Sequence, residues 1–146
     1  IAMRFVMFMI PGVYQGEQGK KVGADFAPPA DAVERMMKYN EELAKAGVLV
    51  ALDGLHPPST GARVSFKGGK ATVTDGPFTE AKEVVGGYWM INVKSRDEAI
   101  AWARRVPADE GDVIEVRQVF EMEEFPPDVQ KAAQNPTVEA AIQKKS

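Results

Sequence analysis

Four stretches of the chain have the length and the apolar content of core β-strands. They lie at residues 4–10, 48–52, 86–93 and 113–120. In two of them, 4–10 and 86–93, polar residues do not alternate with apolar ones, so both faces of the strand are apolar. Strands of this kind lie in sheets that are covered on both faces. We therefore expect a core sheet that packs against something on each side.

Two further stretches repeat apolar residues at the three- and four-residue spacing of an amphipathic helix. The first runs from residue 30 to residue 46 and ends before Gly47, a natural C-terminal stop. The second follows Ser95 and Glu98, which have the spacing of a capping box, and ends before Pro107. The apolar face of the first helix is predicted to hold Val33, Met36, Met37, Leu43 and Ala44.

A β-hairpin is predicted between the second and third core strands. Apolar residues alternate with polar ones over residues 62–67, Gly68-Gly69 can form a two-residue turn, and residues 70–74 return. Residues 11–29, in contrast, are rich in glycine and proline and show almost no periodicity. We expect a long loop there, which is either disordered or folded over a site by Tyr14 and Phe26.

The order of these elements indicates an α+β fold. Without the hairpin, the order is strand, helix, strand, strand, helix, strand, which is that of a ferredoxin-like split βαβ fold with an inserted β-hairpin. This domain is expected to span residues 3–120. Residues 121–146 form a C-terminal extension, with a short helix from Asn135-Pro136 that docks on the body or on a partner chain. Two helices cover one face of such a sheet, so we expect a homodimer that packs its sheets face to face.

Composition narrows the possible functions. The chain has 146 residues, a formal net charge of −3, no cysteine and one histidine. The charge argues against a nucleic acid or an anionic membrane as the main partner. The missing cysteines exclude disulfides and thiolate chemistry, and one histidine excludes a multi-histidine metal site within one chain. We expect no metal and no cofactor.

The longest apolar run, residues 5–10, is far shorter than the roughly 20 residues of a membrane-spanning helix. It also lacks the small-residue cleavage site of a signal peptide. We therefore expect no membrane partner and a cytoplasmic protein that starts naturally at Met3.

Charged residues gather between the predicted hairpin and the third core strand, at residues 74–83. Asp75 either holds the turn by accepting bonds from nearby backbone N–H groups or acts as a general base or ligand contact. In one helical turn, Glu80 and Glu83 share a face and Lys82 points away from it. One interpretation is a solvated, ion-paired turn. The other is a site beside Asp75, in which one of the two glutamates has its pKa raised towards neutrality or the paired carboxylates bind a hard cation.

His56 is the one side chain whose ordinary pKa lies near neutrality. It lies in a proline-bounded loop on the other side of the same hairpin, so it can approach Asp75. The two residues are candidates for a catalytic acid/base pair. The alternative is an exposed loop histidine without a catalytic role.

Four other side chains are candidates for substrate binding. Arg4, Arg63 and Arg117 can hold an anionic group by bidentate bonds, or they can pair with Glu115 or with the acidic segment 121–124. Tyr88 and Trp89 point to opposite faces of their strand. One of these two is expected in the core or a dimer interface, and the other, taken as Tyr88, at a pocket.

The segment Asp75-Gly76-Pro77-Phe78, followed by Glu80, Lys82-Glu83 and Gly86-Gly87-Tyr88, resembles the signature of YCII-related proteins of the DGPF type. The resemblance extends to Leu55-His56-Pro57 and to residues 114–117, and it covers about residues 3–120. It implies a dimeric α+β barrel. One branch of the wider family includes a dehydrochlorinase of a chlorinated hydroxyhydroquinone, for which a His-Asp pair is the proposed catalytic unit. The histidine of that branch lies in the first helix, where this chain has none.

The resemblance thus favours a small-molecule cleft near the DGPF segment, with lyase- or dehydrochlorinase-like acid/base chemistry. DGPF-type proteins are also often encoded beside extracytoplasmic-function sigma factors, which implies an alternative: a ligand-binding or regulatory dimer without catalysis. A third reading is a structural module, in which the signature serves only the turn and the dimer contact.

Overall fold

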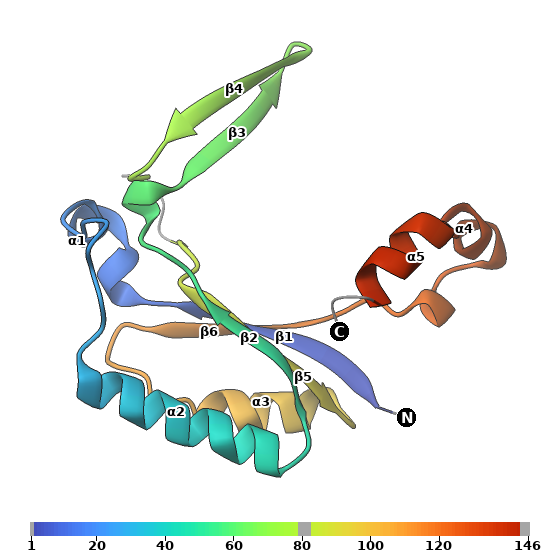
Figure 1. Cartoon of the computed structure of the whole chain (residues 1–146), viewed down its shortest axis with the longest axis horizontal. Coiled ribbons are helices and arrows are strands. Elements are labelled where there is room, and N and C mark those ends of the chain that lie inside the picture. The colour runs from blue at the N-terminus through green and yellow to red at the C-terminus, as the bar shows by residue number, and fades with distance from the viewer. Residues whose placement is uncertain (1, 79–82, 144–146) are drawn as a thin grey trace.

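The computed structural model describes residues 2–78 and 83–143 of the chain. Four antiparallel strands form the main sheet in the order β2-β5-β1-β6. They are β1 (Met3–Ile10), β2 (Leu49–Gly54), β5 (Gly87–Val93) and β6 (Val113–Gln118). Helices α2 (Ala30–Lys45) and α3 (Arg96–Arg104) lie together on one side of this sheet (Figure 1).

Each of these two helices connects a pair of parallel strands that have another strand between them. Helix α2 leads from β1 to β2, which are separated by β5, and α3 leads from β5 to β6, which are separated by β1. That is a split βαβ arrangement. The predicted α+β fold, with a four-stranded antiparallel sheet and a separate hairpin, is confirmed; the face-to-face dimer stays a prediction.

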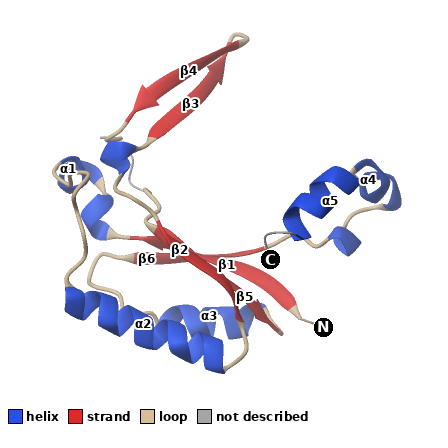
Figure 2. Cartoon of the chain, viewed as in Figure 1, coloured by secondary structure: helices blue, strands red, loops and turns tan. Residues whose placement is uncertain are grey.

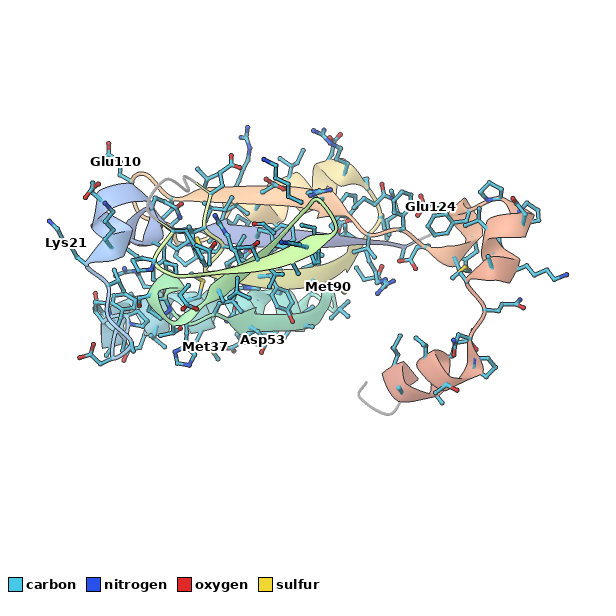
Figure 3. All side chains as sticks on the ribbon, turned by 90° about the horizontal axis from the view of Figure 1, so that it is seen from above. Lys21, Met37, Asp53, Met90, Glu110 and Glu124 are labelled. Atoms are coloured by element: carbon cyan, nitrogen blue, oxygen red, sulfur yellow. The ribbon has the colours of Figure 1, made fainter. Side chains whose placement is uncertain are left out.

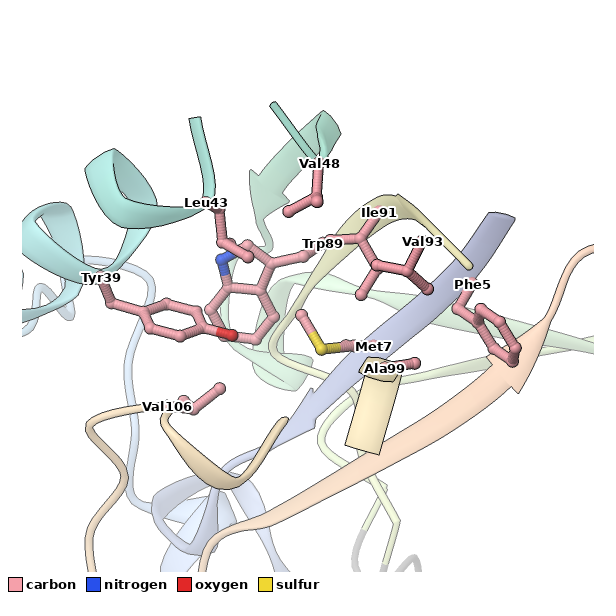
Figure 4. Close-up of a cluster of buried hydrophobic side chains, with 10 residues drawn as sticks. All are labelled: Phe5, Met7, Tyr39, Leu43, Val48, Trp89, Ile91, Val93, Ala99 and Val106. Carbon is pink, nitrogen blue, oxygen red and sulfur yellow. The ribbon is translucent and has the colours of Figure 1, made fainter. Parts of the chain in front are cut away.

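The core lies between the sheet and the two helices (Figure 4). The register of β1 and β5 pairs Phe5 with Ile91 and Met7 with Trp89, so these side chains share one face. Leu43 of α2 completes this layer and is fully buried. The alternate residues of the same strands point to the opposite face, which no helix of the described chain covers. We call this second surface the open face; it includes Val6, Phe8, Tyr88, Met90, Glu115 and Arg117.

Helix α2 buries a different face from the predicted one. Val33 and Met37 are 44% and 58% exposed, whereas Tyr39, Asn40 and Leu43 are buried. The buried positions follow helical spacing, but they include an aromatic and an amide side chain in place of aliphatic ones. The prediction that Val33 and Met37 belong to the core is therefore wrong.

The expectation of disorder at residues 11–29 is wrong, although residues 21–29 contain no helix or strand and Tyr14 does contact Phe26, with ring centres 5.9 Å apart. This segment forms the 3-10 helix η1 (Gly12–Tyr14) and the helix α1 (Gly16–Lys20). Tyr14 packs with Val22 and Val84 in a second, smaller core. The Gln15 side chain accepts a bond from Val84 N at 2.8 Å and donates one to Val84 O at 2.9 Å. The segment is therefore held against the residues that lead into β5.

The remaining elements project from the body. Strands β3 (Ala62–Lys67) and β4 (Lys70–Asp75) form a hairpin that pairs with no strand of the main sheet. Beyond β6, the C-terminal extension contains η3 (Met122–Glu124), α4 (Pro127–Ala132) and α5 (Pro136–Gln143). Figure 2 shows both projections on the side of the sheet away from α2 and α3. The predicted helix at Pro136 is confirmed, and Asn135 caps it through a bond from Val138 N.

Strand β6 ends at Gln118, earlier than predicted, and leaves Phe120 72% exposed. Within residues 2–78 and 83–143, no helix combines the length and the apolar character needed to cross a bilayer.

Candidate functional site

The described part of the DGPF segment closes the root of the hairpin. Gly76 N donates to Gly61 O at 2.9 Å, and a Cβ atom on Gly76 would lie only 1.7 Å from Pro58 O. No other residue fits so close to a backbone carbonyl. The Arg63 guanidinium lies 4.1 Å from the centre of the Phe78 ring. Gly76 and Phe78 therefore have a structural role, which is to join the hairpin to the turn at residues 58–61.

The predicted acid/base pair is not joined in this structure. Asp75 is exposed at the end of β4, opposite Ala62, and His56 is exposed in the loop after β2. Among the described residues, no hydrogen bond connects the two side chains. Glu80 and Lys82 lie outside the described residues. The pairing of His56 with Asp75 stays a prediction.

The other predicted binding residues lie in three separate places. Glu83 and Arg117 both line a cavity of about 240 Å³ on the open face, together with Phe8 and Glu115. Arg117 Nη1 is 3.8 Å from Glu115 Oε2, a loose ion pair between exposed side chains. Arg63 lies on the hairpin, while Tyr88 lines a different cavity. No single cleft in the described chain collects all of these side chains.

The cavity that contains Tyr88 has the character of a small-molecule site. Its volume is about 290 Å³, and it lies where β2 ends and β5 begins, next to α2. Its walls include Met9, Met36, Leu52 and Trp89, and the polar residues Asn40, Asp53 and Tyr88 also line it. Leu52 and Trp89 face α2, whereas Asp53 and its register partner Tyr88 point to the side of the open face. Asp53 lies on the edge strand β2 (Figure 3). Largely apolar cavities with a few convergent polar groups are typical binding sites.

Tyr88 and Asp53 form a hydroxyl–carboxylate pair at this cavity. Tyr88 OH donates to Asp53 Oδ2 at 2.8 Å. This hydrogen bond to a carboxylate, with a smaller contribution from burial, raises the pKa of Tyr88 above its ordinary value. The tyrosine therefore stays protonated at neutral pH. The stability that this bond contributes is present at neutral pH and is lost as the pH rises through the raised pKa.

Asn40 supplies the buried polar group of the cavity wall. It is only 7% exposed, and its Oδ1 accepts a bond from Trp89 Nε1 at 2.7 Å. This bond fixes the orientation of the amide. Nδ2 then lies 3.5 Å from Met37 Sδ, a weak acceptor, and carries a second hydrogen. Asn40 therefore presents a donor on the α2 side of the cavity, whereas the Asp53 acceptor lies on the side of the open face.

Two glycines let the backbone close around this site. A Cβ on Gly87 would lie 2.9 Å from Asp53 O, and a Cβ on Gly86 would lie 2.7 Å from Pro11 Cγ. The backbone of Gly86 also bonds to Met9 O and to Leu55 N, at 2.8 and 2.9 Å. The pair therefore brings β1, β2 and β5 together at the mouth of the cavity.

Replacing Asn40 by leucine is expected to lower the free energy of unfolding by about 2 kcal/mol, because it leaves the buried Trp89 N–H without an acceptor. Urea unfolding of the single variants and of Asn40→Leu/Trp89→Phe measures this. Trp89→Phe should cost less in the Asn40→Leu background than in the wild type. Additive losses would contradict the bond.

Asn40 and Asp53 were not singled out from the sequence, although each carries a signal. Asn40 lies at helical spacing from Met36 and Leu43, so a polar residue occupies the apolar face of α2. Asp53 ends a core strand directly before a glycine, as Asp75 does. In residues 2–78 and 83–143, no three potential His, Cys, Asp or Glu metal ligands lie close enough to bind one ion.

Comparison with known proteins identifies the family. Residues 4–123 match the YCII-related domain, which is most of the chain. An uncharacterised protein of Rhizobium meliloti (strain 1021) is 34% identical over 95 residues, which make up 65% of this chain and 68% of that relative. The matched domain contains both the hairpin root and the cavity with Asn40, Asp53 and Tyr88. The chain belongs to the YCII-related domain family.

Proposed function

We propose that the protein is a homodimer that binds a small, uncharged aromatic molecule in the cavity between α2, β2 and β5. The observation that carries this proposal is the cavity itself, with apolar walls and three polar groups of different character. Its volume of about 290 Å³ suits a compound with one ring. Trp89 and Met36 offer flat and polarisable surfaces for such a ring.

The polar groups define which substituents the ligand carries. Asp53 is the one charged side chain among the described lining residues, so an anionic ligand would meet a like charge. Its Oδ2 accepts from Tyr88, which leaves Oδ1 to accept from a ligand hydroxyl or amine. Asn40 can donate to a ligand carbonyl or hydroxyl oxygen. Asn40 lies on the α2 side of the sheet and Asp53 points to the other side, so a ring in the cavity meets Asn40 directly. It meets Asp53 through a phenol or amine substituent that extends past the edge of the sheet where β2 ends and β5 begins.

The same arrangement supports acid/base chemistry. An Asp53 carboxylate that accepts the hydroxyl hydrogen of a bound phenol is placed to take that proton as a general base. Tyr88, which stays protonated, keeps the carboxylate in position through its 2.8 Å bond. A general base is also what the elimination chemistry implied by the family resemblance requires. Asp53 therefore replaces the His56–Asp75 pair as the preferred candidate.

The dimer part of the proposal rests on the open face. Val6, Phe8 and Met90 lie there only half-buried, and no helix of the described chain covers them. Apolar surface of this extent on a sheet marks a contact with another protein. A second copy is the simplest partner, because a two-fold axis lets the same face cover itself.

Binding of 4-hydroxybenzamide and of its anionic analogue 4-hydroxybenzoate tests the ligand proposal. The wild type should bind the amide more tightly than the carboxylate. Asp53→Asn should weaken binding of the amide roughly tenfold or more, because a charged hydrogen-bond acceptor is lost. Isothermal titration calorimetry measures both effects.

Asp75→Asn is the matched control, since it makes the same change at the other strand end. It should leave the affinity unchanged. If Asp75→Asn loses binding and Asp53→Asn binds normally, the binding site lies at the DGPF segment and not at the cavity beside α2.

A further inference from the structure

The hairpin has one apolar and one polar face. Its register pairs Val64 with Val73 and Phe66 with Ala71 on one face, and the residues between them are polar. Val64, Val73 and Phe66 are 51%, 64% and 80% exposed. An isolated two-stranded hairpin is marginally stable in water, so this apolar face needs a partner.

The C-terminal extension has the complementary properties. Val138 and Ile142 lie on one side of α5 and are 52% and 64% exposed, and Met122 is 45% exposed. Residues 121–143 carry five carboxylates and one lysine, whereas hairpin residues 62–75 carry three cations and one carboxylate. Each projection therefore has exposed apolar side chains, and the two have opposite charge. Opposite potentials of this kind favour association.

The two projections cannot cover each other within one chain. Figure 1 shows the hairpin and the helices α4 and α5 at opposite ends of the sheet, both on the side of the open face. A second copy stacked on the open face brings its own projections to the same side. A two-fold axis that exchanges the ends places the hairpin of each copy beside the extension of the other.

We propose that, in the dimer, the apolar face of the β3–β4 hairpin of each copy packs on the C-terminal extension of the other. This inference rests on the proposed homodimer and adds the two identical contacts that surround its sheet interface. The direction of the extension is fixed at its root, where Arg4 makes a two-pronged ion pair with Glu121 at 2.6 and 3.1 Å. The stacked rings of Phe120 and Phe125, 4.9 Å apart, shape the next turn.

Thiol reactivity tests this contact, because the chain has no cysteine of its own. Ala71→Cys places a thiol on the apolar face of the hairpin, and Thr72→Cys places a matched thiol on the polar face. In dimeric protein, the thiol at position 71 should react with a small maleimide about tenfold more slowly than the thiol at position 72. A covered thiol reacts only after local opening of the contact. Val138→Asp/Ile142→Asp should abolish that difference while the dimer persists.

A charge exchange provides the second measurement. Lys67 and Lys70 lie on the polar face at the tip of the hairpin, so they attract the acidic extension through the potential of the hairpin and not by direct contact. Lys67→Glu/Lys70→Glu should therefore raise the dissociation constant of the dimer, and more so at low salt. Glu123→Lys/Asp128→Lys should do the same. The protein with all four changes should return towards the wild-type constant, as measured by sedimentation.

The possible results separate this inference from the dimer on which it rests. If the thiols at positions 71 and 72 react equally fast in the dimer, the hairpin contact is wrong and the dimer still stands. The same holds if position 71 stays protected in Val138→Asp/Ile142→Asp. The hairpin contact is also wrong if the dissociation constant of the protein with all four charge changes does not return towards the wild-type value. A monomeric wild type overturns both proposals.

Discussion

Replacing Gly76 by alanine is expected to lower the free energy of unfolding by about 3 kcal/mol, in the upper part of the range for overpacked positions. The added methyl group would lie 1.7 Å from Pro58 O and 2.8 Å from Pro58 C. Both are backbone atoms of the turn before the hairpin, so no side chain can rotate away to make room. Urea unfolding, followed by tryptophan fluorescence, measures the loss.

Gly61→Ala is the control for this prediction. Gly61 lies in the same hairpin root, but an added Cβ would meet Pro58 O only at 3.5 Å, an ordinary contact. Its φ of −95° suits any residue. Gly61→Ala should therefore keep nearly the wild-type stability. Equal losses in the two variants would show that the DGPF glycine has no special structural role.

Replacing Val6 by glutamate is expected to convert the proposed dimer into a monomer. Val6 lies between Met90 and Arg117 in the register of the sheet, in the middle of the open face. A carboxylate there would lose its water in a sheet-to-sheet interface, and pairing with the neighbouring Arg117 would offset only part of that cost. The cost of several kcal/mol should raise the dissociation constant roughly a thousandfold. Sedimentation velocity at micromolar concentration measures the change.

Val33→Glu is the matched control on the other side of the molecule. Val33 lies on α2 and is 44% exposed, so the same substitution there adds a charge outside the proposed interface. That variant should remain dimeric. A Val6→Glu protein that sediments like the wild type would place the dimer interface elsewhere or exclude it.

The sheet could be predicted from the sequence because its strands carry their own signal. Strands β1 and β5 are apolar on both faces, which is typical of strands in a covered sheet. The helices between the strands repeat apolar residues at helical spacing and have recognisable end signals. With this order of elements, few sheet topologies are possible. Residues that act locally, such as Ser95 and Asn135 at helix starts, were also found where they were expected.

The segment at residues 11–29 could not be predicted, because its contacts are distant in sequence. Gln15 bonds to the backbone of Val84, 69 residues away, and Ser59 bonds to Val22 O. Neither contact leaves a periodic pattern in the sequence. One glycine that suggested a loop is instead a place of close approach: a Cβ on Gly19 would lie 2.2 Å from Tyr14 O.

The candidate site was only partly predictable for a related reason. Tyr88 was singled out from the sequence and lines a cavity, but its role in binding stays a prediction. Its hydrogen-bond partner Asp53 lies 35 residues earlier, on another strand. The signature residues drew attention to Asp75 and His56, which are exposed and not bonded to each other in the described chain. A motif that is needed to close a turn looks, in sequence, like a motif that performs chemistry.

If ligands bind in the cavity beside Trp89, the indole N–H resonances of the protein report it directly. The chain has two tryptophans. Trp89 lines the cavity and donates to Asn40, whereas Trp102 lies outside it, against Tyr39 and Arg105. Titration of ¹⁵N-labelled protein with 4-hydroxybenzamide should shift the Trp89 indole resonance in a saturable way and leave that of Trp102 in place. Saturable binding that leaves the Trp89 resonance unmoved would contradict the account.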